Sequence, residues 1–230
     1  MKVVILAGGL GTRLAEETDI KPKPMVEIGG KPIIWHVMKT YSRYGYNDFI
    51  ILLGYKGYVV KEFFFNYFLH NNDVSIDLKN NKISYLGTDS EPWKVSLIDT
   101  GLNTMTGSRL KKAQKFLNDD KFFLTYGDGI SNINIEKQLE FHSSHSGIVT
   151  MTSVQPDGRF GAFESNIDGR VEKFIEKPAG DGSWVNGGYF ICDPALFKYI
   201  PEGLDIVFEE EPLGNLAIER KLFTYQHKGF

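Results

Sequence analysis

The chain opens with an apolar run that leads into a glycine-rich loop, Val3-Val4-Ile5-Leu6-Ala7-Gly8-Gly9-Leu10-Gly11-Thr12-Arg13-Leu14. The apolar residues predict a buried strand, and the glycines predict a tight turn at its carboxyl end. In a doubly wound sheet, ligands bind at this end of the strands. Because glycine has no Cβ, its backbone N–H can approach phosphate oxygens closely. The segment therefore predicts a phosphate-binding loop.

Two common glycine motifs do not fit this loop. The dinucleotide fingerprint G-x-G-x-x-G would need glycine at Leu14, and the P-loop pattern has no match because Arg13 and Leu14 stand in the wrong places. A dinucleotide-dependent oxidoreductase is therefore poorly supported.

The next motif is Lys21-Pro22-Lys23-Pro24, whose prolines we expect to hold the segment extended. Lysines preset in this way suit a triphosphate.

The rest of the first half alternates helix and strand patterns. Helices are predicted from Pro32 to about Tyr44 and around residues 59–68 and 110–117, and strands at residues 49–53 and 122–125. This alternation predicts an α/β fold with a doubly wound, mostly parallel sheet covered by helices on both faces. Residues 74–86 predict a β-hairpin around Asn80-Asn81. Residues 159–192 predict a β-rich stretch with turns at 166–169 and 179–183, and Asp193-Pro194 predicts a helix start.

Composition narrows the function classes. The 230 residues are 42% hydrophobic and 24% charged, as in ordinary globular domains. The longest aromatic-rich run, residues 63–69, is far shorter than the roughly 20 residues of a membrane span. Cys192 is the single cysteine, which excludes an intrachain disulfide and favours a cytoplasmic location; we expect a core residue rather than a nucleophile. For His142 and His145 we expect a solvated helix end rather than a zinc site.

Charge is divided unevenly along the chain. The net charge of −3 argues against nucleic-acid binding. Residues 1–115 carry 16 basic and 11 acidic side chains, whereas residues 116–230 carry 10 and 18. A positive first half attracts an anionic small molecule, and the later carboxylates can hold a metal. Scatter on a solvated surface is an equally open interpretation.

The glycine loop and the Lys-Pro-Lys-Pro motif together resemble the signature of the sugar-1-phosphate nucleotidyltransferase family, and the resemblance extends over nearly the whole chain. It implies one Rossmann-like domain over residues 1–230, with a nucleotide-binding half at about 1–130 and a β-rich sugar-binding half at about 131–230. Residues 22–33, Glu91-Pro92-Trp93, Asp99-Thr100-Gly101 and Met105-Thr106-Gly107 resemble members that use CTP and glucose 1-phosphate. A UTP- or dTTP-dependent enzyme and a non-catalytic nucleotide-sugar-binding protein remain alternatives.

The resemblance also implies the residues that contact each substrate. The nucleotide-binding set is Leu6, Ala7, Gly8, Gly9, Gly11, Thr12, Arg13, Thr104, Gly107 and Arg109, and Arg109 also suits a phosphate clamp. Ser108 departs from the family, which often has a second glycine there. The sugar-phosphate set is Lys23, Gly161, Glu176, Lys177, Asn186 and Gly187.

Arg13, Lys23 and Asp128 are the catalytic residues that the resemblance implies, and Asp128 is the Mg²⁺ ligand, with the metal as cofactor. Asp128 follows the predicted strand at residues 122–125. The family has a second metal carboxylate that we expect after Phe230, so we expect a truncated chain or an enzyme with weakened metal binding. The resemblance further implies a homo-oligomer that acts in lipopolysaccharide O-antigen biosynthesis, with no membrane or nucleic-acid partner.

Overall fold

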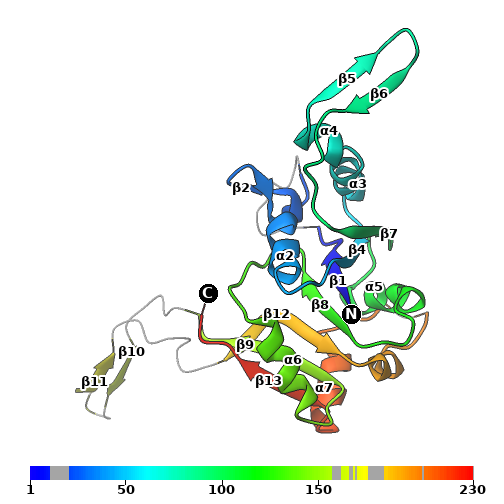
Figure 1. Cartoon of the computed structure of the whole chain (residues 1–230). Coiled ribbons are helices and arrows are strands. Elements are labelled where there is room, and N and C mark those ends of the chain that lie inside the picture. The colour runs from blue at the N-terminus through cyan, green and yellow to red at the C-terminus, as the bar shows by residue number, and fades with distance from the viewer. Residues whose placement is uncertain are drawn as a thin grey trace.

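A computed structural model describes residues 1–10, 21–156, 162–165, 168, 170–175, 184–203 and 205–229, with the backbone alone at 162–165 and 172–175. Its centre is a seven-stranded sheet with the order β13-β9-β12-β8-β1-β4-β7 (Figure 1). These strands are β1 (Lys2–Ala7), β4 (Asp48–Leu53), β7 (Lys94–Asp99), β8 (Phe122–Tyr126), β9 (Val149–Val154), β12 (Val185–Cys192) and β13 (Leu222–Gln226). The predicted α/β fold is confirmed.

The sheet is mostly parallel. Strands β8, β1, β4 and β7 run in one direction, and β13 is parallel to β9. Strand β12 is the exception, because it is antiparallel to both β8 and β9. The carboxyl ends of β1 and β8 therefore meet at one edge, which places Gly8 and Asp128 on the same side of the sheet.

Helices cover both faces of the sheet. They are α2 (Ile33–Ser42), α3 (Gly57–Phe65), α4 (Tyr67–Asn71), α5 (Thr106–Ala113), α6 (Ile135–Ser143) and α7 (Glu211–Ile218), with 3-10 turns η2 (Lys23–Met25), η3 (Gln114–Phe116) and η5 (Pro194–Tyr199). Alternate residues of β1 point to opposite faces. Val4 and Leu6 pack with side chains of α5 and α7, whereas Val3 and Ile5 pack with side chains of α2 and α6. Each fully buried side chain of this kind contributes about 1.5–3 kcal/mol.

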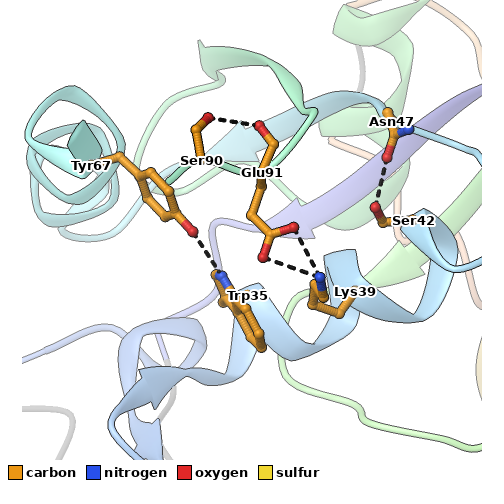
Figure 2. A network of polar contacts seen from close by, with 7 residues as sticks. All are labelled: Trp35, Lys39, Ser42, Asn47, Tyr67, Ser90 and Glu91. Atoms are coloured by element: carbon orange, nitrogen blue, oxygen red, sulfur yellow. Dashed lines mark hydrogen bonds and ion pairs between the residues drawn. The ribbon is translucent and has the colours of Figure 1, made fainter. Parts of the chain in front are cut away.

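The predicted helix at residues 59–68 is divided in two. Asn66 has φ −92° and ψ 10°, outside regular helix geometry, so α3 ends at Phe65 and α4 starts at Tyr67. Figure 2 shows how α4 is tied to α2: the Trp35 Nε1–H donates to the Tyr67 hydroxyl at 3.0 Å. Beside it, Lys39 pairs with Glu91 at 2.9 Å. The motif residue Glu91 thus anchors the segment that precedes β7 to the helix α2.

Small two-stranded sheets complete the fold. They are β2 (Glu27–Ile28) with β3 (Lys31–Pro32), β5 (Val74–Asp77) with β6 (Lys82–Tyr85), and β10 (Ala162–Ser165) with β11 (Val171–Ile175). The predicted hairpin is confirmed, with Asn81 at φ 50°, and it stands away from the main sheet (Figure 1). Of the predicted turn at 166–169 the structure describes only Asp168, which lies in a turn, and the turn at 179–183 lies outside the described residues.

Two local predictions have different outcomes. Asp193 caps η5, because its Oδ1 accepts a hydrogen bond from the Ala195 N–H at 3.3 Å, as predicted. The expected solvated helix end at His142 is wrong. His142 is buried and its Nδ1 lies 2.8 Å from the Thr150 hydroxyl, and burial lowers its pKa to about 4. The apolar face of α6 packs on β9, so this side chain points inward.

Cys192 is fully buried within the core, as expected. In the part of the chain that the structure describes, no helix has the length and apolar character needed to cross a membrane.

Candidate active site

A cavity of about 430 Å³ lies at the carboxyl ends of β1 and β8. It is formed by the loop after β1, by the turn η2, by the segment before α5 and by the end of β8. Its lining residues are Leu6, Ala7, Gly8, Gly9, Leu10, Lys23, Pro24, Leu102, Asn103, Thr104, Met105, Thr106, Arg109, Tyr126 and Asp128. This is the place at which an open α/β sheet binds its ligands.

The glycine loop begins where the buried strand β1 ends. A Cβ added at Gly8 would lie 2.4 Å from the Arg109 guanidinium, so any larger residue there would have to displace this buried side chain. At Gly9, no atom of the described residues lies within 4 Å of the corresponding position. The loop therefore lets the backbone pass tightly over Arg109 and lines the cavity. Gly11, Thr12 and Arg13 lie outside the described residues.

Arg109 lies beneath the glycine loop, with 4% of its surface exposed. Its Nη1 donates to the Leu53 carbonyl, the Thr100 hydroxyl and the Gly101 carbonyl, at distances from 2.6 to 3.0 Å. Its Nη2 donates to the carbonyls of Gly8 and Leu102, both at 3.0 Å. Burial lowers the pKa of this guanidinium, although nearby carboxylates oppose the shift. The side chain lines the cavity, but this arrangement favours bracing its loops over a bidentate phosphate clamp.

Lys23 and Asp128 form an ion pair in the cavity. The Lys23 Nζ lies 2.6 Å from the Asp128 Oδ2, and about one third of each side chain is exposed. The predicted extended conformation of the Lys-Pro-Lys-Pro segment is wrong from Lys23 onward, where η2 forms. Proline fixes φ near −65°, which suits a 3-10 turn as well as an extended chain. The turn directs Lys23 toward the end of β8.

Asp128 suits a magnesium ion by its chemistry. Mg²⁺ usually takes one or two protein carboxylates and fills its other positions with phosphate oxygens and water. Asp128 provides one such oxygen donor beside the glycine loop. Among the described residues no group of three or more His, Cys, Asp or Glu side chains is close enough to form a complete protein cage. This donor set fits an ion that arrives with phosphates.

Of the other predicted nucleotide contacts, Thr104 lines the cavity and Gly107 does not. The Thr104 hydroxyl donates to the Thr100 carbonyl at 2.6 Å. The Gly107 N–H donates to the Ile206 carbonyl at 2.8 Å, and a Cβ at Gly107 would lie 2.8 Å from that same oxygen. The absence of a side chain at Gly107 thus allows α5 to pack against residues 205–208.

The predicted sugar-side residues are only partly described. Gly161, Glu176 and Lys177 lie outside the described residues. Asn186 and Gly187 are on β12, beside the cavity rather than in its lining. The Asn186 Nδ2 lies 3.4 Å from the hydroxyl of Tyr126, and the Asn186 Oδ1 accepts from the Gly188 N–H at 2.8 Å. Tyr126 thus connects Asn186 to the cavity.

The predicted site sets do not name Tyr126, Thr106 or Glu209, although Thr106 lies in the predicted Met105-Thr106-Gly107 motif. Tyr126 stands at the end of a predicted strand, two residues before Asp128, which is a signal that could have found it. Glu209 has no local signal, because its partners Tyr126 and Thr106 are 83 and 103 residues away in the chain.

Comparison with known proteins defines the class. The sequence profile described as "Nucleotidyl transferase" matches residues 2–228, and the chain belongs to this family. Over its full length it is 51% identical to the glucose-1-phosphate cytidylyltransferase of Salmonella typhimurium and covers 89% of that relative. It is 43% identical to a probable glucose-1-phosphate cytidylyltransferase of Bacillus subtilis, again over the whole chain and 89% of the relative.

A solved structure extends the likeness to three dimensions. The crystal structure of HddC from Yersinia pseudotuberculosis superposes with a TM-score of 0.68 at 25% identity, covering all of this chain and 91% of that one. The fold that holds Lys23 and Asp128 is therefore shared with that solved structure.

Proposed function

We propose that this chain is a glucose-1-phosphate cytidylyltransferase, which transfers the cytidylyl group of CTP to glucose 1-phosphate and releases pyrophosphate. The observation that carries the proposal is 51% identity, over the whole chain, to a relative of that name. The cavity supports it, because the glycine loop, Lys23 and Asp128 together suit a triphosphate.

The reaction is a direct displacement. A phosphate oxygen of glucose 1-phosphate attacks the α-phosphorus of CTP and forms the new P–O bond. The bond from the α-phosphorus to the bridging oxygen breaks, and pyrophosphate leaves with its electron pair. The attacking phosphate is already a nucleophile, so the enzyme contributes positioning and charge neutralisation rather than proton transfer.

The residues of the chain have separate roles in this proposal. The backbone N–H groups of the glycine loop, with Arg13, hold the β- and γ-phosphates. Lys23 stabilises negative charge at the reacting phosphates, for which its position in the cavity is support. Asp128 holds Mg²⁺, which when bound neutralises phosphate charge. Gly161, Glu176, Lys177, Asn186 and Gly187 bind the sugar phosphate.

Two further proposals concern the whole protein. The chain forms a homo-oligomer, and it acts in the cytoplasm, where it supplies CDP-glucose for O-antigen biosynthesis. Support for self-association comes from the exposed apolar side chains of the β5–β6 hairpin, including Ile76 and Ile83.

The test is a panel of CTP, UTP, dTTP and ATP, each with glucose 1-phosphate and Mg²⁺. We expect pyrophosphate release and CDP-glucose with CTP, and turnover at least about ten-fold lower with the other three. Faster turnover of UTP or dTTP would move the assignment to a related transferase. Binding of CTP without pyrophosphate release would make the protein a nucleotide-sugar-binding protein.

A further inference from the structure

Glu209 lies behind the cavity, in the short segment that precedes α7. Its side chain is half-buried and does not line the cavity itself. We infer that Glu209 is a positioning residue. It acts through Thr106, at the start of α5, and Tyr126, at the end of β8, and fixes these two sides of the cavity relative to each other. The inference rests on the proposed transferase function and adds a residue to it.

The carboxylate of Glu209 accepts hydrogen bonds from two hydroxyl groups of the cavity lining. The Thr106 Oγ1 donates to the Glu209 Oε2 at 2.6 Å, and the Tyr126 hydroxyl donates to the Oε1. The Thr106 hydroxyl oxygen also accepts from the Phe208 N–H at 2.9 Å, so its proton has to point toward Glu209. One carboxylate therefore links Thr106, at the start of α5, to Tyr126, at the end of β8.

The contacts continue from Tyr126 to Asn186, one of the proposed sugar-phosphate residues. The Tyr126 hydroxyl that donates to Glu209 also has an acceptor oxygen. Its oxygen then faces the Asn186 Nδ2 at 3.4 Å. The amide of Asn186 is also held by the Gly188 N–H. Glu209 thus orients a chain of side chains that reaches a proposed sugar-phosphate residue.

Other contacts dock the same segment independently of Glu209. The Asp205 Oδ1 accepts from the Met105 N–H at 2.7 Å, and the Ile206 carbonyl accepts from the N–H groups of Gly107 and Ser108 at 2.8 and 3.2 Å. The Ile206 N–H donates to the Ser108 hydroxyl at 2.8 Å. Because these bonds remain when Glu209 is changed, the segment stays docked, and the effect of the change falls on Tyr126 and Thr106.

The first test is Glu209→Gln, which keeps size and shape but leaves one carbonyl oxygen for two hydroxyl donors. We expect kcat/KM for CTP and glucose 1-phosphate to fall about ten-fold while the thermal unfolding midpoint stays near wild type. The matched control is Glu210→Gln at the exposed neighbouring residue, which should keep wild-type kcat and KM. Wild-type kinetics for Glu209→Gln would overturn the inference, as would a loss of activity that only follows a loss of folded protein.

A double-mutant cycle with Tyr126→Phe identifies the route of the effect. If Glu209 acts through the Tyr126 hydroxyl, the two changes together should reduce kcat/KM by less than the product of their single effects. Fully independent effects would contradict that route.

Calorimetric titration separates this inference from the proposed function. If wild type releases no pyrophosphate with any nucleoside triphosphate, the proposed function fails. The Glu209→Gln variant is then judged by its affinity for whichever triphosphate wild type binds, where we expect about ten-fold weaker binding. Equal affinity of the two proteins would overturn the positioning role by itself.

Discussion

Asp128 and Lys23 form an ion pair in the cavity, and their proposed roles depend on how much free energy it costs to separate the pair. Both side chains are about one third exposed. Exposed ion pairs contribute only about 0.2–1 kcal/mol, because water and salt screen them. The pair can therefore open at low cost, which frees the carboxylate for Mg²⁺ and the ammonium for phosphate.

Asp128→Asn tests this residue directly. The amide keeps the shape of the side chain but removes its negative charge, so we expect pyrophosphate release to fall at least about 100-fold. Stability should change little, because the ion pair is exposed. The matched control is Asp120→Asn, at an exposed position next to the strand β8, and it should keep wild-type turnover. Full turnover by Asp128→Asn would remove the metal assignment.

Arg109 illustrates a different role for a charged residue. Its guanidinium reaches five acceptors, at the end of β4 and in the loops after β1 and β7. Because a lysine ammonium has only three donors and no planar fork, Arg109→Lys leaves buried carbonyl groups unpaired.

We expect Arg109→Lys to lower the free energy of unfolding by about 2–3 kcal/mol and to raise the KM for CTP. Urea denaturation measures the first effect and initial rates the second. Arg43→Lys, at an exposed position after α2, is the control and should change neither. Wild-type stability of the Arg109 variant would show that the bracing contacts contribute nothing.

Among the elements, the β5–β6 hairpin has an unusual distribution of side chains. Ile76 pairs with Ile83 across the two strands, and both are 54% exposed on one face of the ribbon. Ser75 and Ser84 pair on the opposite face. A two-stranded hairpin is marginally stable in water by itself, so an exposed apolar face favours a covering partner.

Ile76→Ser combined with Ile83→Ser tests whether this face mediates self-association. We expect light scattering to give a multiple of the monomer mass for wild type and a smaller assembly for the variant, because the apolar face is lost. Ser75→Ala with Ser84→Ala changes the opposite face and should leave the mass unchanged. A monomeric wild type across the micromolar range would exclude the oligomer.

At the scale of the whole molecule, the cavity is assembled from segments that are far apart in the chain. Strand order β12-β8-β1-β4 brings the glycine loop, Asp128 and Asn186 to neighbouring positions. A ligand that bridges these segments binds the folded chain but not the unfolded chain, and it therefore stabilises the folded state. Ligand at 100 times its Kd adds about 2.7 kcal/mol.

We therefore expect saturating CTP with Mg²⁺ to raise the thermal midpoint by about 5–10 °C for a protein of this size. Removing the metal with a chelator should reduce the shift, since the phosphates then lose a charge partner. ATP serves as the comparison nucleotide and should shift the midpoint less. An equal shift for both nucleotides would contradict selective recognition of the cytosine base.

Local patterns in the sequence determined many of the strands and the position of the candidate site. The apolar runs at residues 3–6, 49–53 and 122–125 predict buried strands, because strands covered on both faces need continuous apolar residues. The glycines after the first run and Asp128 after the third predict a site at the carboxyl edge of the sheet. Where local chemistry allows two outcomes, prediction failed: Lys23 entered a 3-10 turn, and His142 turned inward.

The sequence by itself determined the α/β class, the glycine loop and the family, since these depend on neighbouring residues and on short motifs. Only the tertiary structure decided that Lys23 meets Asp128, that Arg109 braces Gly8, and that Glu209 joins Tyr126 to Thr106. The physical reason is that such contacts depend on strand order and helix packing, which follow from burying both faces of the sheet together.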